Sequence, residues 1–140
     1  MGGGPGTTDP KVVGPEELLW RFTEDIWYLP NASGKPEIQQ AAFVGQVSLV
    51  RVALGITEEI VDAAKAGKFS KHGIAVLKAS EIRSVTGGDL RVDPDGDWPP
   101  NAHVLFIRST SGKTLRLKHR EVADLTDLAN SRPLLRPPKP

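Results

Sequence analysis

The apolar residues of this chain come in short runs that glycine and proline repeatedly interrupt. The sequence holds 14 Gly and 12 Pro among 140 residues, and its unbroken apolar runs, such as 74–77 and 104–107, are only a few residues long. A membrane-spanning helix needs roughly 20 consecutive apolar residues, so these runs are far too short for one. Short runs favour short strands and helices. We therefore predict an α+β fold, with a small, mostly antiparallel sheet and two or three helices on one face.

The ends of the chain differ in composition from its middle. Residues 1–10 contain four Gly, two Pro and no apolar residue after Met1, so we predict a disordered segment over 1–15. Residues 132–140 contain four Pro and three cations, which predicts a basic, extended tail. The single α+β domain is then expected over 16–131.

Periodicity and turn residues place the elements inside this domain. We expect strands within 41–54 and at 73–78, 90–92, 103–108 and 114–118, and helices from Thr57 to Gly67, at 79–85 and at 119–130. A turn is expected at 93–97, and the aromatic-rich stretch 18–29 fits a helix and a strand equally.

Composition and motifs exclude several kinds of site. The absence of cysteine rules out disulfides, cysteine-based zinc sites and thiol nucleophiles. The sequence 111–114 resembles the end of a phosphate-binding loop, but Ile107 stands where that loop needs its first glycine, so a hairpin turn is the better interpretation. The alternating acids of 93–97 lack the glycine and glutamate of a calcium-binding loop. We predict no metal site and no cofactor.

Catalysis has one weak candidate centre. His103 begins a predicted strand, and together with Asp93, Asp97 and Arg21 it could form an acid–base or ligand site. A second possible set joins Arg21 and Ser48 with Glu81 or Glu121, as in enzymes that handle NAD. His72 is expected to be a solvated loop residue. We assign no catalytic residue on this evidence.

Charge is distributed unevenly along the chain. Residues 1–107 carry 10 basic and 14 acidic side chains, a net charge of −4, whereas residues 108–140 carry 8 basic and 3 acidic side chains, a net charge of +5. A positive region can bind an acidic protein or a nucleic acid. The sequence pI of about 8.0 is lower than the value above roughly 9 that is typical of nucleic-acid-binding domains.

The order of short motifs resembles that of a widespread group of small, mostly uncharacterised bacterial proteins. The matching segments are Leu-Trp-Arg at 19–21, Gln-Ala-Ala-Phe at 40–43, Val-Ser-Leu-Val at 47–50, Gly-Ile-Ala-Val at 73–76, Val-Asp-Pro at 92–94 and Pro-Asn-Ala-His-Val at 100–104. The chain departs from the pattern by inserting 114–118 before its last helix. The resemblance implies a bacterial, cytoplasmic protein and no particular chemistry.

These observations favour a protein that acts by binding rather than by catalysis. We predict an accessory or interaction protein whose partner is another protein, with an acidic partner or a nucleic acid as an alternative and no membrane partner. The predicted partner-binding residues are aromatic and basic: Trp20, Arg21, Trp27, Tyr28, Arg116, Lys118 and Arg120. The main alternative is a small-ligand-binding protein or enzyme centred on His103, and a further alternative is nucleic-acid binding through the basic C-terminal hairpin and tail.

Overall fold

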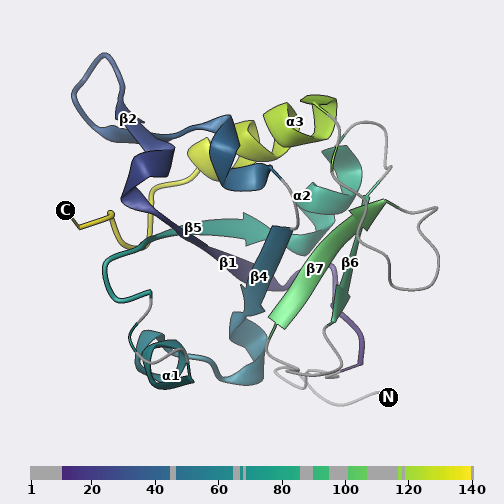
Figure 1. Cartoon of the computed structure of the whole chain (residues 1–140). Helices are drawn as coiled ribbons and strands as arrows, with labels where there is room; N and C mark the ends of the chain where they lie inside the picture. Colours follow the sequence, from purple (N-terminus) through teal and green to yellow (C-terminus); the bar gives the residue numbers. More distant parts are fainter. Residues whose placement is uncertain are drawn as a thin grey trace.

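An antiparallel sheet organises the chain (Figure 1). The computed structural model describes residues 11–44, 47–64, 67, 69–85, 90–94, 101–106, 117 and 119–139. Within these residues five strands pair in the order β5-β1-β4-β7-β6, every pair antiparallel. Their bounds are β1 Leu18–Thr23, β4 Val47–Arg51, β5 Gly73–Lys78, β6 Leu90–Pro94 and β7 Asn101–Phe106.

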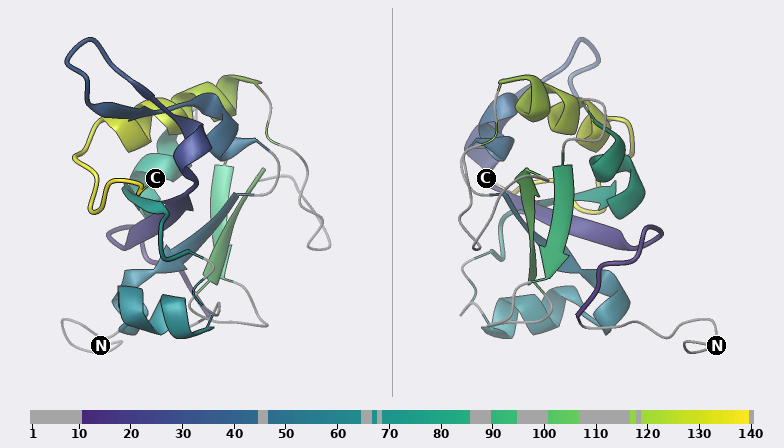
Figure 2. Two further views of the ribbon diagram at one scale, coloured as in Figure 1. Left: turned by 60° about the vertical axis from the view of Figure 1, so that its left-hand side comes forward. Right: turned by 90° about the vertical axis from the view of Figure 1, so that its right-hand side faces the viewer.

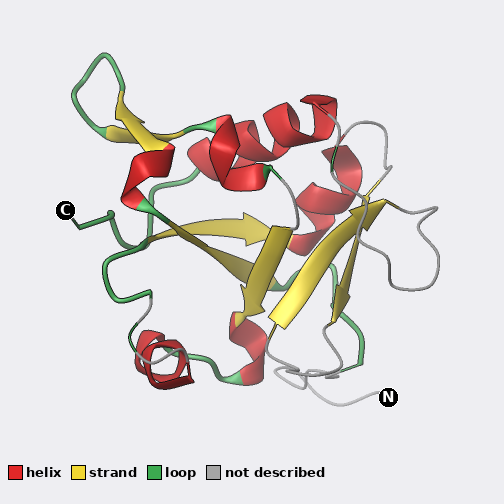
Figure 3. Ribbon diagram, viewed as in Figure 1, coloured by secondary structure: helices red, strands yellow, loops and turns green. Residues whose placement is uncertain are grey.

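Helices and a small hairpin complete the described fold (Figure 3). The α-helices are α1 Glu58–Ala64, α2 Ala79–Ser84 and α3 His119–Asn130. The 3-10 turns are η1 Asp25–Trp27, η2 Gln40–Phe43 and η3 Val52–Leu54, and β2 Tyr28–Pro30 pairs with β3 Pro36–Ile38. This is the predicted α+β class, with two of the helices, α2 and α3, on one face of the sheet (Figure 2).

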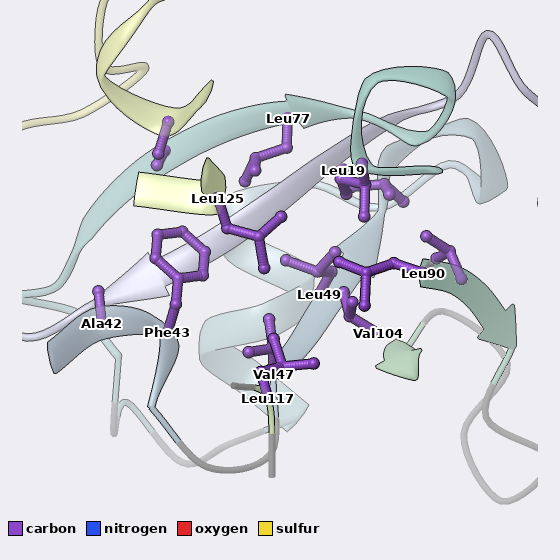
Figure 4. Packing of buried hydrophobic residues seen from close by; sticks show 14 of the residues in the cluster. Leu19, Ala42, Phe43, Val47, Leu49, Leu77, Leu90, Val104, Leu117 and Leu125 are labelled. Atoms are coloured by element: carbon purple, nitrogen blue, oxygen red, sulfur yellow. The ribbon is translucent and has the colours of Figure 1, made fainter. Parts of the chain in front are cut away.

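The main core lies between the sheet and the layer formed by α2, α3 and η2. Alternation along the strands sends one set of side chains to this face, for example Leu19 from β1, Leu49 from β4 and Leu77 from β5. These leucines pack with Phe43 of η2 and Leu125 of α3, all at most 1% exposed (Figure 4). Burial of this continuous apolar layer is the main source of stability.

A smaller cluster lies on the opposite face, beneath α1. Its buried members are Phe22, Val50, Ile56, Val61 and Ile74. The helix that covers them has the predicted start, because the Thr57 hydroxyl accepts a hydrogen bond from the Ile60 N–H at 3.2 Å. Gly67 follows with a φ of 75°, a left-handed conformation that suits glycine.

The segment before β1 is packed against the body of the protein. The sequence predicts disorder over 1–15, yet Val13 is 3% exposed and its carbonyl accepts a hydrogen bond from Arg83. Arg51 explains the ordering: it is fully buried and binds the Glu17 carboxylate through Nε at 2.9 Å and Nη2 at 2.8 Å. Its Nη2 also donates to the Val12 carbonyl at 2.7 Å. A buried guanidinium needs these acceptors, so the segment is held in place.

The C-terminal segment lies along the free edge of β5. The Ile74 N–H donates to the Arg136 carbonyl at 2.8 Å, and the Leu135 N–H donates to the Ile74 carbonyl at 3.0 Å. Gly73 permits this close approach, since a Cβ there would lie 2.5 Å from the Tyr28 hydroxyl oxygen and 3.1 Å from Pro138. The proline-rich segment is therefore built into the fold rather than projecting from it.

Several predicted elements differ from those observed. The predicted strand over 41–54 is confirmed only for β4, because 40–43 forms a 3-10 turn that buries Phe43. Asp93 and Pro94 of the turn expected at 93–97 belong to β6, where they pair with His103 and Ala102, and 95–97 lie outside the described residues. The stretch 18–29 begins with a strand, β1, followed by η1. The predicted strand 114–118 lies outside the described residues apart from Leu117, which is buried.

Candidate functional site

A groove opens on the sheet face opposite the main core. It has a volume of about 300 Å³ and lies where β1 and β4 meet α1 and the segment that leads into β5. Its apolar wall consists of Trp20, Phe22, Val50, Val61 and Phe69. Its polar groups come from Arg21, Glu24, Ser48, His72 and Asn101, and Trp27 completes the lining. Concave, largely apolar sites with a few polar groups are the usual form of a binding pocket.

Aromatic packing fixes the floor of the groove. Residues two apart on a strand share a face, so Trp20 and Phe22 of β1 both point into the groove, with ring centres 6.3 Å apart and edge to face. Phe22 stacks on Phe69 with centroids 5.5 Å apart. The His72 ring meets Phe69 edge-on at 4.9 Å. His72 is therefore half-buried in the wall, which corrects the expectation of a solvated loop residue.

Arg21 occupies the gap where β1 and β4 separate. The two strands pair directly at two positions, Leu19 with Arg51 and Trp20 with Val50. Beyond that point the Arg21 guanidinium donates from Nη1 to the Ser48 carbonyl at 2.9 Å. It also donates from Nε and Nη2 to the Ala42 carbonyl, at 3.1 Å and 2.7 Å. The guanidinium thus takes the place of backbone hydrogen bonds that the diverging strands no longer make.

The electrostatic environment of Arg21 is unusual. Its guanidinium carbon lies 5.4 Å from the centre of the Trp27 ring and 6.0 Å from that of Phe43. Burial lowers the pKa of Arg21 to about 10, and the Glu24 carboxylate opposes this shift. The partners of the Arg21 guanidinium are neutral carbonyls and rings, and the described part of the chain provides it with no salt bridge. The side chain remains a cation at neutral pH.

A second hollow adjoins the groove. It has a volume of about 420 Å³, shares Glu24 and His72 with the groove, and is lined further by Ile26, Lys71 and Lys139. Ile26 is 76% exposed, which is high for an isoleucine. Glu24 and His72 line both hollows, so the two lie side by side.

The predicted centre around His103 is assembled in part. Ser48, His103 and Asp93 are direct neighbours across β4, β7 and β6, and they lie in one row on the groove side of the sheet. His103 Nδ1 and the Ser48 hydroxyl are 3.1 Å apart. The Asp93 carboxylate accepts a hydrogen bond from Arg91 Nε at 2.8 Å. Asp97, the second carboxylate of the predicted centre, lies outside the described residues.

This row can share a proton but lacks the other features of a nucleophilic centre. The Ser48 backbone belongs to a regular ladder, whereas a nucleophilic serine is typically exposed on a sharp turn. The carboxylates of the second predicted set are elsewhere: Glu81 pairs with Arg132, and Glu121 is buried on α3. Among the described residues, no three His, Asp or Glu side chains converge as a metal site.

The predicted partner-binding residues separate into two groups. Trp20, Arg21 and Trp27 come together in the groove. Tyr28 does not join them, because it is 8% exposed and its hydroxyl bonds to that of Thr23 inside the fold. Arg120 is exposed on α3, on the other side of the sheet. Arg116 and Lys118 lie outside the described residues.

Sequence reasoning missed the wall contributed by Glu24, Phe69 and His72. The sequence signal was weak, since Phe69 and His72 stand in a polar stretch without strand or helix periodicity. Their position depends on Arg136, whose guanidinium donates to the carbonyls of His72 and Phe69 at 2.9 Å and 2.8 Å. A contact between positions more than sixty residues apart cannot be read from local pattern.

The chain matches no family model, no curated protein and no solved structure in the comparisons made with it. None of the helices in the described residues is long and apolar enough to cross a membrane. The candidate site is therefore argued from its geometry alone.

Proposed function

We propose that this chain is a non-catalytic binding protein whose groove receives an apolar or aromatic side chain of a partner protein. The observation that carries the proposal is the placement of Trp20, Phe22 and Phe69 around a hollow of about 300 Å³ that is also lined by polar groups. Aromatic and arginine side chains in partly desolvated pockets dominate the energetics of protein interfaces. The resemblance noted above adds that the protein is bacterial and cytoplasmic, as part of the same proposal.

The neighbouring hollow favours an extended segment over an isolated small molecule. It shares Glu24 and His72 with the groove, and it is lined further by exposed Ile26 and by two lysines. A partner segment could place one side chain in the groove and lay its backbone across the adjoining hollow. Catalysis is a weaker alternative, since Ser48 and His103 are cross-strand neighbours in a regular ladder and their hydrogen bond is the one expected of such a polar pair.

Nucleic-acid binding through the tail is also weaker. Two of the cations predicted to form the basic surface are already paired inside the fold. Arg132 binds Glu81, and Arg136 binds Glu58 with Nη1 at 2.7 Å from Oε1. An arginine that is paired in this way contributes less positive potential to a phosphate backbone.

Peptide selection on the full chain tests the proposal. Short peptides are selected from a display library, and their affinities are then measured for the wild type, Trp20→Ala and Leu29→Ala. Leu29 is the matched control because it is 59% exposed on β2 and does not line the groove. We expect selected peptides to contain an aromatic or large apolar residue and to bind Trp20→Ala at least about tenfold more weakly.

The control variant should bind these peptides like the wild type. Unfolding midpoints of both variants are measured in parallel, so that a loss of binding is not confused with a loss of structure. Peptides that bind Trp20→Ala and the wild type equally would contradict the proposal.

A further inference from the structure

We infer that Arg21 is a receptor for a carboxylate carried by the partner segment, next to the aromatic or apolar side chain that enters the groove. This inference rests on the proposed function and specifies the chemistry of the partner. The side chain in question would be an Asp or Glu of the partner. Trp20 lines the groove from the groove face of β1, and Arg21 lines it from the gap between β1 and β4.

The first support is a comparison among the arginines. Arg51, Arg91, Arg132 and Arg136 each contact a carboxylate of this chain. Arg21 has no such partner among the described residues, although Trp27 and Phe43 lie over its guanidinium and the two separating strands enclose it. Enclosing a cation without a counter-ion is costly, and an incoming anion offsets that cost.

The second support is the number of hydrogen-bond donors. A guanidinium has five N–H groups in a fixed fork. The three hydrogen bonds to the Ala42 and Ser48 carbonyls use Nε once and each Nη once. One N–H therefore remains on each Nη, and these two donors are available to a carboxylate. The lowered pKa described above agrees with a guanidinium that lacks a counter-ion.

The other charges around the groove limit which anion fits. Glu24 lies at the junction of the two hollows and attracts Arg21, although no salt bridge joins them. Arg136 stands over Phe22 at 5.8 Å and is neutralised by Glu58. A compact single carboxylate attached to an apolar group can reach Arg21 while keeping away from Glu24. A highly charged polyanion would meet Glu24 and Asp25 along its length.

Three small probes test the inference on the full chain: 3-phenylpropionate, its uncharged amide and phenethylammonium. Their affinities are measured by chemical-shift perturbation of groove residues. We expect the carboxylate to bind at least about tenfold more tightly than the amide and the ammonium compound to bind most weakly. Arg21→Gln should remove the preference for the carboxylate, and Arg21→Lys should restore part of it, because lysine keeps the charge but loses the fork.

Arg120→Gln is the matched control, since Arg120 is an exposed arginine on α3 away from the groove. It should leave all three affinities unchanged. If the wild type binds the amide and the carboxylate equally, the role given to Arg21 is wrong while the groove remains a binding site. If none of the probes shifts a groove resonance, the inference and the proposed function both fail.

Discussion

The two faces of the sheet are built differently, and the difference divides stability from binding. The main face is covered by α2, α3 and η2, and its interior is mostly aliphatic, with Leu19, Leu49 and Leu125 at most 1% exposed. The opposite face is covered by the seven-residue α1, and its cluster is smaller and contains Phe22 beside half-buried Trp20. A sheet that obtains most of its stability from one face can leave recessed aromatic surface on the other.

A second contrast separates two enclosed arginines of neighbouring strands, Arg51 of β4 and Arg21 of β1. Arg51, on the main face, has the Glu17 carboxylate as its partner, and Nη2 and Oε2 are 2.8 Å apart. Arg21, beside the groove, is held by neutral carbonyls. A salt bridge completed inside the fold serves structure, whereas a cation left without one is available to a ligand.

Matched truncations on β5 should give the largest effect and test the comparison directly. Leu77 points into the main core and Ile74 into the smaller cluster, and both are at most 1% exposed. We expect Leu77→Ala to lower the free energy of unfolding by about 4–5 kcal/mol and Ile74→Ala by about 2–3 kcal/mol, because neighbours beside a groove can move to fill the space. Urea denaturation measures both. Equal losses would show that the two faces are equally well packed.

Neutralising Glu17, which acts on Arg51, and Glu24, which acts on Arg21, should sharpen the comparison of the two arginines. Glu17→Gln leaves Arg51 buried without a counter-ion, so we expect a loss of about 3 kcal/mol in the free energy of unfolding. Glu24→Gln serves as the matched change at the groove, and we expect less than about 0.5 kcal/mol there because Glu24 makes no salt bridge with Arg21. Thermal and urea unfolding measure the pair. A large loss for Glu24→Gln would indicate that Arg21 depends on it structurally.

The smallest effect concerns Tyr28, the one tyrosine of the chain. Burial raises the pKa of its hydroxyl above 10.0, although the hydrogen bond with Thr23 opposes the shift. The folded state therefore keeps a proton that the unfolded chain releases, and this contribution to stability is complete below pH 10 and declines as the pH rises through the raised pKa. Because Tyr28 is the one tyrosine of the chain, phenolate absorbance measures the ionisation of Tyr28 alone. Tyr28→Phe should remove this part of the alkaline loss, and a phenolate that titrates near pH 10 in the folded protein would contradict the argument.

Local patterns were sufficient for much of the fold. The apolar run at 73–78 and the spacing of 119–130 predict β5 and α3, and Thr57 and Gly67 mark the start and end of the segment that holds α1. Local patterns gave wrong predictions where contacts between distant parts of the sequence determine the structure. Phe43 lies in a 3-10 turn because it fills the main core, and Val13 is ordered because Arg51 and Arg83 bind the carbonyls around it.

The candidate site was predicted in the same partial way. Residue type alone selected Trp20, Arg21 and Trp27, and the structure brings these three together. Residue type also selected Tyr28, but the Tyr28 hydroxyl bonds to the Thr23 hydroxyl inside the fold. The sequence alone does not reveal this contact. The wall formed by Phe69 and His72 depends on hydrogen bonds from the distant Arg136, so local sequence patterns could not predict it.

Leu135 and Arg136 pair with Ile74 on the outer border of β5, and this pairing affects whether the protein associates with itself. Strands with unpaired amides and carbonyls recruit strands from other molecules, and here Leu135 and Arg136 occupy those groups on Ile74. Shortening the chain after Asn130 would uncover that border and leave Glu58 without its cation. Fusion proteins and proteolytic fragments that keep residues 131–139 should remain monodisperse, while those that lose them should self-associate.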